Sequence, residues 1–184
     1  NVIDVDWSRE AIQRIKTIVK MAEDAEILCV HENCSGWGSL SWEHTLLLLE
    51  KVNSPALKLV YDTGNPIFDL DVRGEKPYKK QDPWEFYIHV KPYIVYLHIK
   101  DGYEDKDGKA VFTFPGEGHG KVREILTDLF ATGYDGGLSI EPHMAVVYHD
   151  PNIKSEEETR YNNYIEYGKR LEKMVAEIKQ SLKK

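Results

Sequence analysis

The sequence has little of what marks secreted, membrane-spanning or disulfide-stabilised proteins. Its 184 residues include two cysteines, Cys29 and Cys34, too few for a disulfide framework and compatible with a reducing cytoplasm, where we expect the protein. The longest run of Leu, Ile and Val covers residues 46–49, far below the ~20 apolar residues of a membrane span. Residues 1–6 carry neither a basic nor an apolar segment, so we expect no signal peptide.

Positive charge is also scarce. Lys and Arg number 24 against 31 Asp and Glu, which gives a formal net charge of -7. A protein that binds the phosphate backbone of nucleic acids normally needs a positively charged face. The excess of acidic residues therefore argues against a nucleic-acid partner. Hydrophobic residues make up 41% and charged residues 30%, which suits a globular chain whose residues 1–184 form one domain.

Apolar runs of strand length alternate with amphipathic helical patterns along the chain. We predict strands at residues 27–32, 57–62, 93–98 and 138–141. Helices are predicted at residues 8–21, 42–52, 122–131 and 157–182, with a further helix opening at 82–85. Residues 69–81 and 100–120 are predicted to be charged or polar loops. Strands that alternate with helices indicate the α/β class, with a parallel sheet and helical crossovers.

Each predicted strand ends at a polar side chain that can bind a metal: Glu32, Asp62, His98 and Glu141. In a parallel barrel the carboxyl ends of all strands open at one face, so these four side chains would converge there. Three carboxylates and one imidazole suit a divalent cation that prefers oxygen ligands. We expect Mn²⁺ first, with Mg²⁺, Co²⁺ or Zn²⁺ as alternatives.

The residues around these positions carry a resemblance to a known family. The relevant strings are Glu32-Asn33, Asp62-Thr63-Gly64-Asn65, His98-Ile99-Lys100-Asp101, Pro115-Gly116-Glu117-Gly118 and Ser139-Ile140-Glu141-Pro142-His143. In this order and spacing they resemble the C-terminal half of the xylose isomerase-like TIM barrels, the sugar (phosphate) isomerase/epimerase group. The resemblance covers nearly the whole chain. It implies a (β/α)8 TIM-barrel fold of which this chain carries the last four βα units, from helix 4 through helix 8.

The resemblance also implies a chemistry. Glu32, Asp62, His98 and Glu141 would be the metal ligands, and the two glutamates would double as acid and base. The substrate would be a keto sugar, a sugar phosphate or a related hydroxy-carbonyl compound, converted through a metal-bound enediolate. Return of the proton to the opposite face gives epimerisation, and return to the neighbouring carbon gives isomerisation. The sequence leaves these two outcomes open.

Three other functions are considered. An inosose-type dehydratase would use the same proton abstraction and then expel a hydroxyl group. A non-catalytic half-domain would bind metal or sugar without turnover. An endonuclease IV-type DNA repair enzyme is disfavoured, because Asn65 stands where that pattern expects a histidine and because the net charge is negative.

Further residues are candidates for substrate contacts. Lys100 is predicted to polarise a substrate oxygen, and Asp101 to orient His98 or Lys100. The remaining candidates for substrate binding are Asn33, Trp37, Asn65, Glu117 and His143, although turn formation or core packing explains several of them equally well. Phosphate binding by the basic segment is left open, with charged loop residues Arg73, Lys76, Lys79 and Lys80.

Four strands are too few for a closed barrel. By strand alternation, Leu28, Val30 and Tyr96 share the inward face with the metal-binding positions. An open half would expose this face and two sheet edges. We therefore weigh three explanations. The chain is part of a longer barrel, which we prefer, two copies form a homo-oligomer with a composite barrel, or the chain forms a stable four-stranded sheet with its own closure.

Overall fold

The computed structural model describes residues 5–144 and 157–183. The main sheet consists of β1 (Cys29–Glu32), β2 (Leu57–Asp62), β5 (Ile94–Ile99) and β8 (Gly137–Ile140). Its helices are α1 (Val5–Asp24), α2 (Trp42–Val52), α3 (Asn65–Phe68), α4 (Pro83–Val90), α5 (Val122–Ala131) and α6 (Glu157–Ser181). Short 3-10 helices cover Trp37–Ser39 and Lys91–Tyr93.

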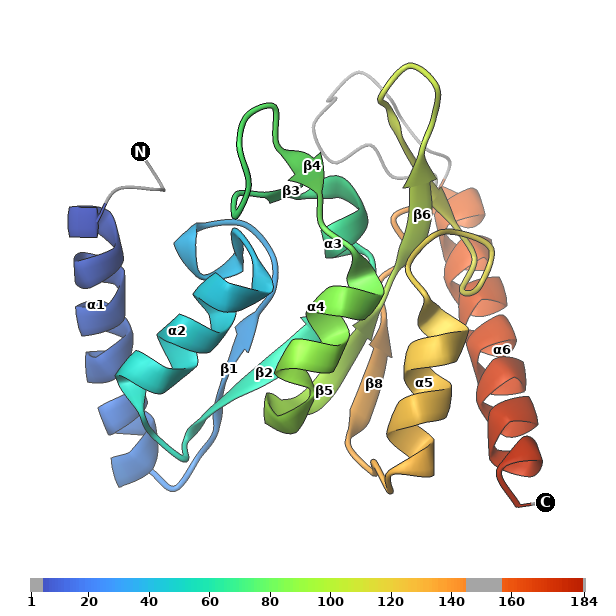
Figure 1. Ribbon diagram of the computed structural model, residues 1–184. Helices are drawn as coiled ribbons and strands as arrows, with labels where there is room; N and C mark the ends of the chain where they lie inside the picture. Colours follow the sequence, from blue (N-terminus) through green and yellow to red (C-terminus); the bar gives the residue numbers. More distant parts are fainter. Residues whose placement is uncertain (1–4, 145–156, 184) are drawn as a thin grey trace.

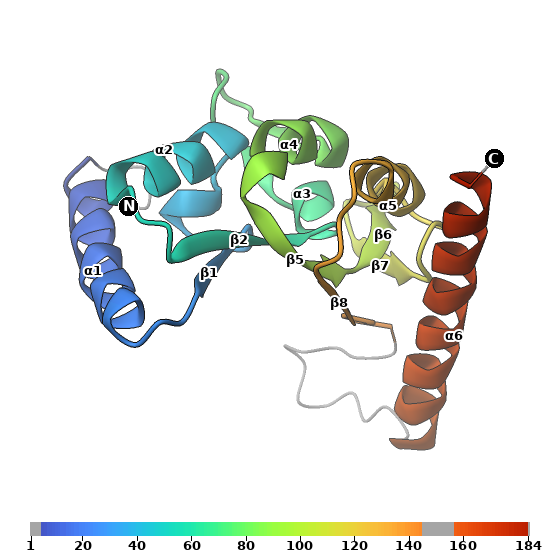
Figure 2. The same ribbon diagram turned by 90° about the horizontal axis from the view of Figure 1, so that it is seen from below.

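The four main strands lie in the order β1-β2-β5-β8, and every pair is parallel. Helices α2, α4 and α5 cover one face of this sheet, while α1 and α6 flank its two ends (Figures 1 and 2). This is the α/β architecture with a parallel sheet that the alternating sequence pattern predicts. The βα order of the described chain is that of part of a TIM barrel.

Local signals in the sequence explain where the helices begin. The Asp82 side chain accepts a hydrogen bond from the backbone N–H of Glu85 at 2.8 Å, and Pro83 opens α4. Ser41 caps α2 in the same way, by accepting from the N–H of His44. The predicted strand positions are confirmed within two residues at each end.

Two predicted loops are only partly irregular. The segment 69–81 contains a small antiparallel pair, β3 (Leu70–Asp71) and β4 (Lys79–Lys80). The segment 100–120 contains a second hairpin, β6 (Asp101–Glu104) and β7 (Ala110–Thr113). The prediction of plain loops was wrong here, because short strands paired only with each other leave little hydrophobic periodicity. Both hairpins lie beyond the carboxyl ends of the main strands (Figure 1).

The core lies between the sheet and the covering helices. Leu59, Tyr61, Leu97 and Ile99 point to this side and are fully buried against helices α4, α5 and α6. A second cluster joins α1 and α2 to the start of β2. The residues of the main strands alternate, so the neighbouring side chains face the opposite side.

The opposite face is open in the described part of the chain. Leu28 is 58% exposed and Val30 is 47% exposed, and Tyr96 is also exposed. Parallel sheets are normally covered on both faces, so this exposed apolar surface is where a barrel would continue. Among residues 5–144 and 157–183, no helix has the length and apolar character that a bilayer crossing requires.

Candidate metal centre

The four predicted metal-binding residues come together at the carboxyl ends of the main strands. Glu32, Asp62 and His98 lie at or near the ends of β1, β2 and β5, and Glu141 directly follows β8. One potential ligand atom from each lies within 4.8 Å of those of the other three. The pairing of neighbouring strands explains why these atoms are close together. Asp62 of β2, for example, is paired with His98 of β5.

Asp62 is held in one orientation by the backbone that follows it. Its Oδ1 accepts hydrogen bonds from the N–H groups of Gly64 and Asn65, each at 2.7 Å. Its Oδ2 is buried without a hydrogen bond of good geometry among the described residues and lies 3.0 Å from the Nζ of Lys100. Such an oxygen, desolvated and directed to the other ligands, fits coordination of a cation.

His98 presents its Nδ1 to the same point. This nitrogen lies 2.8 Å from Oε1 of Glu141 and 3.6 Å from Oε1 of Glu32. It is buried and has no hydrogen-bond partner of good geometry in the described chain. Together with the buried Oδ2 of Asp62, the donor set of three carboxylates and one imidazole fits a divalent metal ion.

Lys100 is the buried cation of this group. Its side chain is 6% exposed, and its Nζ lies 3.0 Å from Asp62 and 3.2 Å from Glu141. The Thr63 hydroxyl accepts from the Lys100 backbone N–H and donates to its carbonyl, which holds the start of this segment against β2. Burial opposes the charge of Lys100, but the two carboxylates outweigh it and raise its pKa.

The carboxylates respond differently to this environment. Burial raises the pKa of Asp62 to about 6, because loss of hydration outweighs the attraction of Lys100. Burial also acts on Glu141, which is more exposed, and there Lys100 and His98 prevail and lower its pKa. Glu141 is therefore ionised at neutral pH.

Asn33 and Asn65 contact the group in two different ways. The buried Asn33 amide donates to the Asp62 carbonyl at 3.0 Å and accepts from the Asp62 N–H at 2.7 Å, so it joins β1 to β2. Asn65 donates to Oε1 of Glu32 at 3.2 Å and thereby orients one of the candidate metal-binding carboxylates.

Asp101 organises the glycine-rich loop after the β6–β7 hairpin. It is 1% exposed, and its carboxylate accepts backbone N–H bonds of 2.8 to 3.1 Å from Gly102, Gly116, Gly118 and Gly120. A Cβ at Gly118 would lie 2.4 Å from Oδ1 of Asp101, so the loop can approach this closely only without a side chain there.

The other candidate residues lie in varied positions. Glu117 is exposed and pairs with Arg170 of α6 at 2.6 Å. His143 has its Nε2 3.8 Å from Glu141, beside the metal-binding group. Trp37 is 7% exposed in the core cluster of α1 and α2, where its ring contacts His44. The substrate-binding roles that we predict for these residues stay predictions.

Phe112 is a residue near this group that the sequence pattern did not single out. Its ring contacts His143, with 4.9 Å between ring centroids, and Phe68, with 5.2 Å. Only the pairing of β6 with β7 brings it there, although its alternation with Val111 and Thr113 could have suggested a strand.

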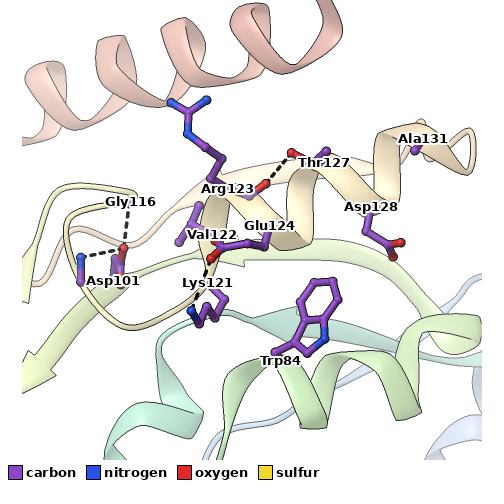
Figure 3. Close-up of a pocket in the computed structure, with 11 residues that line it drawn as sticks. Trp84, Asp101, Gly116, Lys121, Val122, Arg123, Glu124, Thr127, Asp128 and Ala131 are labelled. Atoms are coloured by element: carbon purple, nitrogen blue, oxygen red, sulfur yellow. Dashed lines mark hydrogen bonds and ion pairs between the residues drawn. The ribbon is translucent and has the colours of Figure 1, made fainter. Parts of the chain in front are cut away.

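A pocket of about 710 Å³ lies elsewhere, between α4 and the start of α5 (Figure 3). Trp84 forms one wall, and Lys121 and Glu124 form an ion pair at its rim. None of the four metal-binding candidates lines it. Although this pocket is large, it is separate from the four candidate metal ligands, so we do not assign the chemistry to it.

The fold and the site together define a class. They are those of a parallel βα-barrel protein with a group of candidate metal ligands at the carboxyl ends of its strands. The model of the xylose isomerase-like TIM barrel family matches residues 3–171, and the chain belongs to this family. Comparison with curated protein sequences finds no significant match.

Solved structures of similar fold are longer than this chain. A xylose isomerase domain protein from Planctomyces limnophilus matches with a TM-score of 0.70 and 21% identity, over 97% of this chain and 56% of that one. A D-tagatose 3-epimerase-like protein matches with a TM-score of 0.66 and 19% identity, over 96% and 57%. A xylose isomerase-like TIM barrel protein from Mycobacterium smegmatis, in complex with magnesium, matches with a TM-score of 0.61 and 21% identity, over 89% and 51%. The chain thus spans little more than half their length.

Proposed function

We propose that this chain carries the metal centre of a divalent-metal-dependent sugar isomerase or epimerase. The observation that carries the proposal is the convergence of Glu32, Asp62, His98 and Glu141 within 4.8 Å. Family membership and the likeness to an epimerase-like protein and to a magnesium complex support it. A bound cation would stabilise the negative charge that develops on two substrate oxygens.

The chain's own residues supply the proton transfers. Glu32 and Glu141 both lie within 3.6 Å of the His98 Nδ1, so two carboxylates flank one point. One removes the proton next to the carbonyl of a keto sugar, and the other returns it. Lys100, buried beside Glu141, donates a hydrogen bond to a substrate oxygen and so stabilises its charge.

The open face of the sheet needs a cover. We propose that a second four-stranded βα unit supplies it, from a longer polypeptide or from a second copy of this chain. The exposed Leu28, Val30 and Tyr96, together with unpaired edges of β1 and β8 in the described chain, support this. Light scattering would give the mass of the assembly.

Proton exchange tests the proposed function directly. The Mn²⁺-loaded protein is incubated with D-tagatose in D₂O, and loss of the C3–H signal is followed by proton NMR. Wild type should exchange this proton, and Glu141→Gln should not. Glu124→Gln, on the surface of α5, is the matched control and should exchange like wild type. Exchange that survives in Glu141→Gln would remove that residue from the chemistry.

Product analysis separates the alternatives. A product lighter by one water would indicate a dehydratase on the same site. Stoichiometric metal without exchange, for any keto sugar tested, would indicate a non-catalytic binding domain. A product with the elemental composition of the substrate, apart from one carbon-bound hydrogen replaced by deuterium, supports an isomerase or epimerase.

A further inference from the structure

We infer that Tyr167 of α6 is a positioning residue for the metal centre and acts through the backbone carbonyl of Ile99, which also holds Glu141. The inference rests on the proposed function and adds to it a residue outside the four candidate ligands. It follows from two hydrogen bonds that meet at one carbonyl oxygen, and from the packing that fixes the Tyr167 ring.

The carbonyl of Ile99 lies where the end of β5 meets the end of β8. Ile99 stands between His98, a candidate ligand, and Lys100, the buried cation of the site. Its carbonyl accepts the backbone N–H of Glu141 at 3.0 Å, just beyond the last residue pair of the β5–β8 ladder. The direction of this carbonyl therefore fixes where the Glu141 backbone lies relative to His98.

Tyr167 supplies a second hydrogen bond to the same oxygen. Its hydroxyl donates to the Ile99 carbonyl at 3.1 Å, in a buried position. A carbonyl oxygen has two lone pairs, so it can accept from the Glu141 N–H and from the Tyr167 hydroxyl together. Burial raises the pKa of Tyr167, so the hydroxyl keeps its proton at neutral pH and remains a donor. A carbonyl that is held by two donors has less freedom to turn than one held by the ladder alone.

The Tyr167 ring is itself fixed by packing. It is 1% exposed and belongs to the core cluster between the sheet and its helices. Its ring contacts that of Phe114, with 6.0 Å between ring centroids. The Arg170 guanidinium lies over the Phe114 ring, 3.8 Å from its centroid. Because close packing leaves a buried ring little room to move, the Tyr167 hydroxyl is presented in one direction.

The glycine-rich loop joins α6 to the same segment by a second route. Met174 of α6 packs closely on this loop, since a Cβ at Gly116 would lie 2.7 Å from the Met174 Cε. Gly116 in turn donates its N–H to the Asp101 carboxylate at 2.8 Å. Residues 99–101 are therefore connected to α6 directly through Tyr167 and indirectly through the loop.

Tyr61 offers a matched comparison on the same sheet. It is 0% exposed, and its hydroxyl donates to the backbone carbonyl of Pro83 at 2.6 Å. Pro83 opens α4 on the helix-covered side of the sheet, whereas the Ile99 carbonyl also holds Glu141. The two tyrosines thus make the same kind of buried bond, and only the bond of Tyr167 leads to a candidate ligand.

Calorimetric titration with Mn²⁺ tests the inference without turnover. Tyr167→Phe keeps the ring in the core and removes only the hydroxyl, and it should weaken Mn²⁺ binding roughly 3- to 10-fold. This loss is smaller than the ~10- to 100-fold of a direct partner of a ligand, because Tyr167 acts through the backbone. Tyr61→Phe is the control and should stay within about twofold of wild type. Both variants should lower the urea midpoint by similar amounts, since each loses one buried hydrogen bond.

The outcomes separate this inference from the proposed function. Wild-type Mn²⁺ affinity in Tyr167→Phe, or equal losses of affinity in Tyr167→Phe and Tyr61→Phe, would overturn the inference and leave the proposed function standing. Loss of the cooperative unfolding transition in Tyr167→Phe would also overturn it, because the hydroxyl would then serve the whole fold. A selective loss of affinity in Tyr167→Phe, with a wild type that binds Mn²⁺ but exchanges no sugar proton, would support the inference and refute the proposed function. A wild type that binds no Mn²⁺ would overturn both.

Discussion

The carboxylate of Asp101 gives the sharpest stability prediction. It is 1% exposed and accepts four backbone N–H bonds, two on each oxygen. Asp101→Asn keeps one oxygen and turns an NH₂ group toward two donors. Each buried donor that loses a charged acceptor costs ~1.5–3 kcal/mol, so the variant should lose ~3–6 kcal/mol of its free energy of unfolding.

Urea unfolding followed by circular dichroism measures this loss. At a slope of about 2 kcal/mol per molar urea, the midpoint should fall by about 1.5–3 M. Asp105→Asn is the matched control, because Asp105 also accepts two N–H bonds, from Asp107 and Lys109, but at an exposed turn. Water replaces those bonds, so its loss should stay under about 1 kcal/mol. Equal midpoints for the two variants would refute the reasoning.

Three further predictions concern the metal centre and the open face. In calorimetry, Asp62→Asn should weaken Mn²⁺ binding by more than about 100-fold. Asn65→Ala, which only removes the hydrogen bond to Glu32, should weaken it by about tenfold. Equal Mn²⁺ affinities of the two variants would argue against these ligand assignments. Mn²⁺ affinity should be constant above pH 6 and fall about tenfold per pH unit below it, since protons compete for Asp62, whose pKa is raised to about 6; a flat profile between pH 5 and pH 7 would contradict this. Val30→Asp should convert a dimer of this chain to a monomer in light scattering, whereas a folded wild-type monomer would show that no second copy covers the face.

Much of the fold follows from local signals. The apolar runs and caps define α2 and α4 to the residue at their starts, because Ser41 and Asp82 bond to N–H groups only three positions away. The metal-binding positions were also accessible, since parallel strands bring their carboxyl ends to one edge. The two small hairpins, β3–β4 and β6–β7, could not be predicted in this way. Their strands are short, pair only with each other and carry no clear hydrophobic alternation.

The roles of several site residues depend on contacts that no local pattern reveals. In the sequence, Asn33 looks like any asparagine that forms a turn. In the structure, its side chain makes hydrogen bonds to the backbone of Asp62, 29 residues further along the chain. Trp37 lies in a loop by sequence and in a core cluster by packing. Phe112 contacts the rings of Phe68 and His143 only because β6 and β7 pair.

Strand alternation and helical periodicity are properties of neighbouring residues. The succession of strands and helices along the chain, and the four residues at the strand ends, could therefore be predicted without the structure. Which N–H groups donate to Asp62 and Asp101, and which carboxylates neutralise Lys100, is known only from the folded chain. Those outcomes depend on distances between segments far apart in the chain, and burial then sets the cost of every polar group left without a partner.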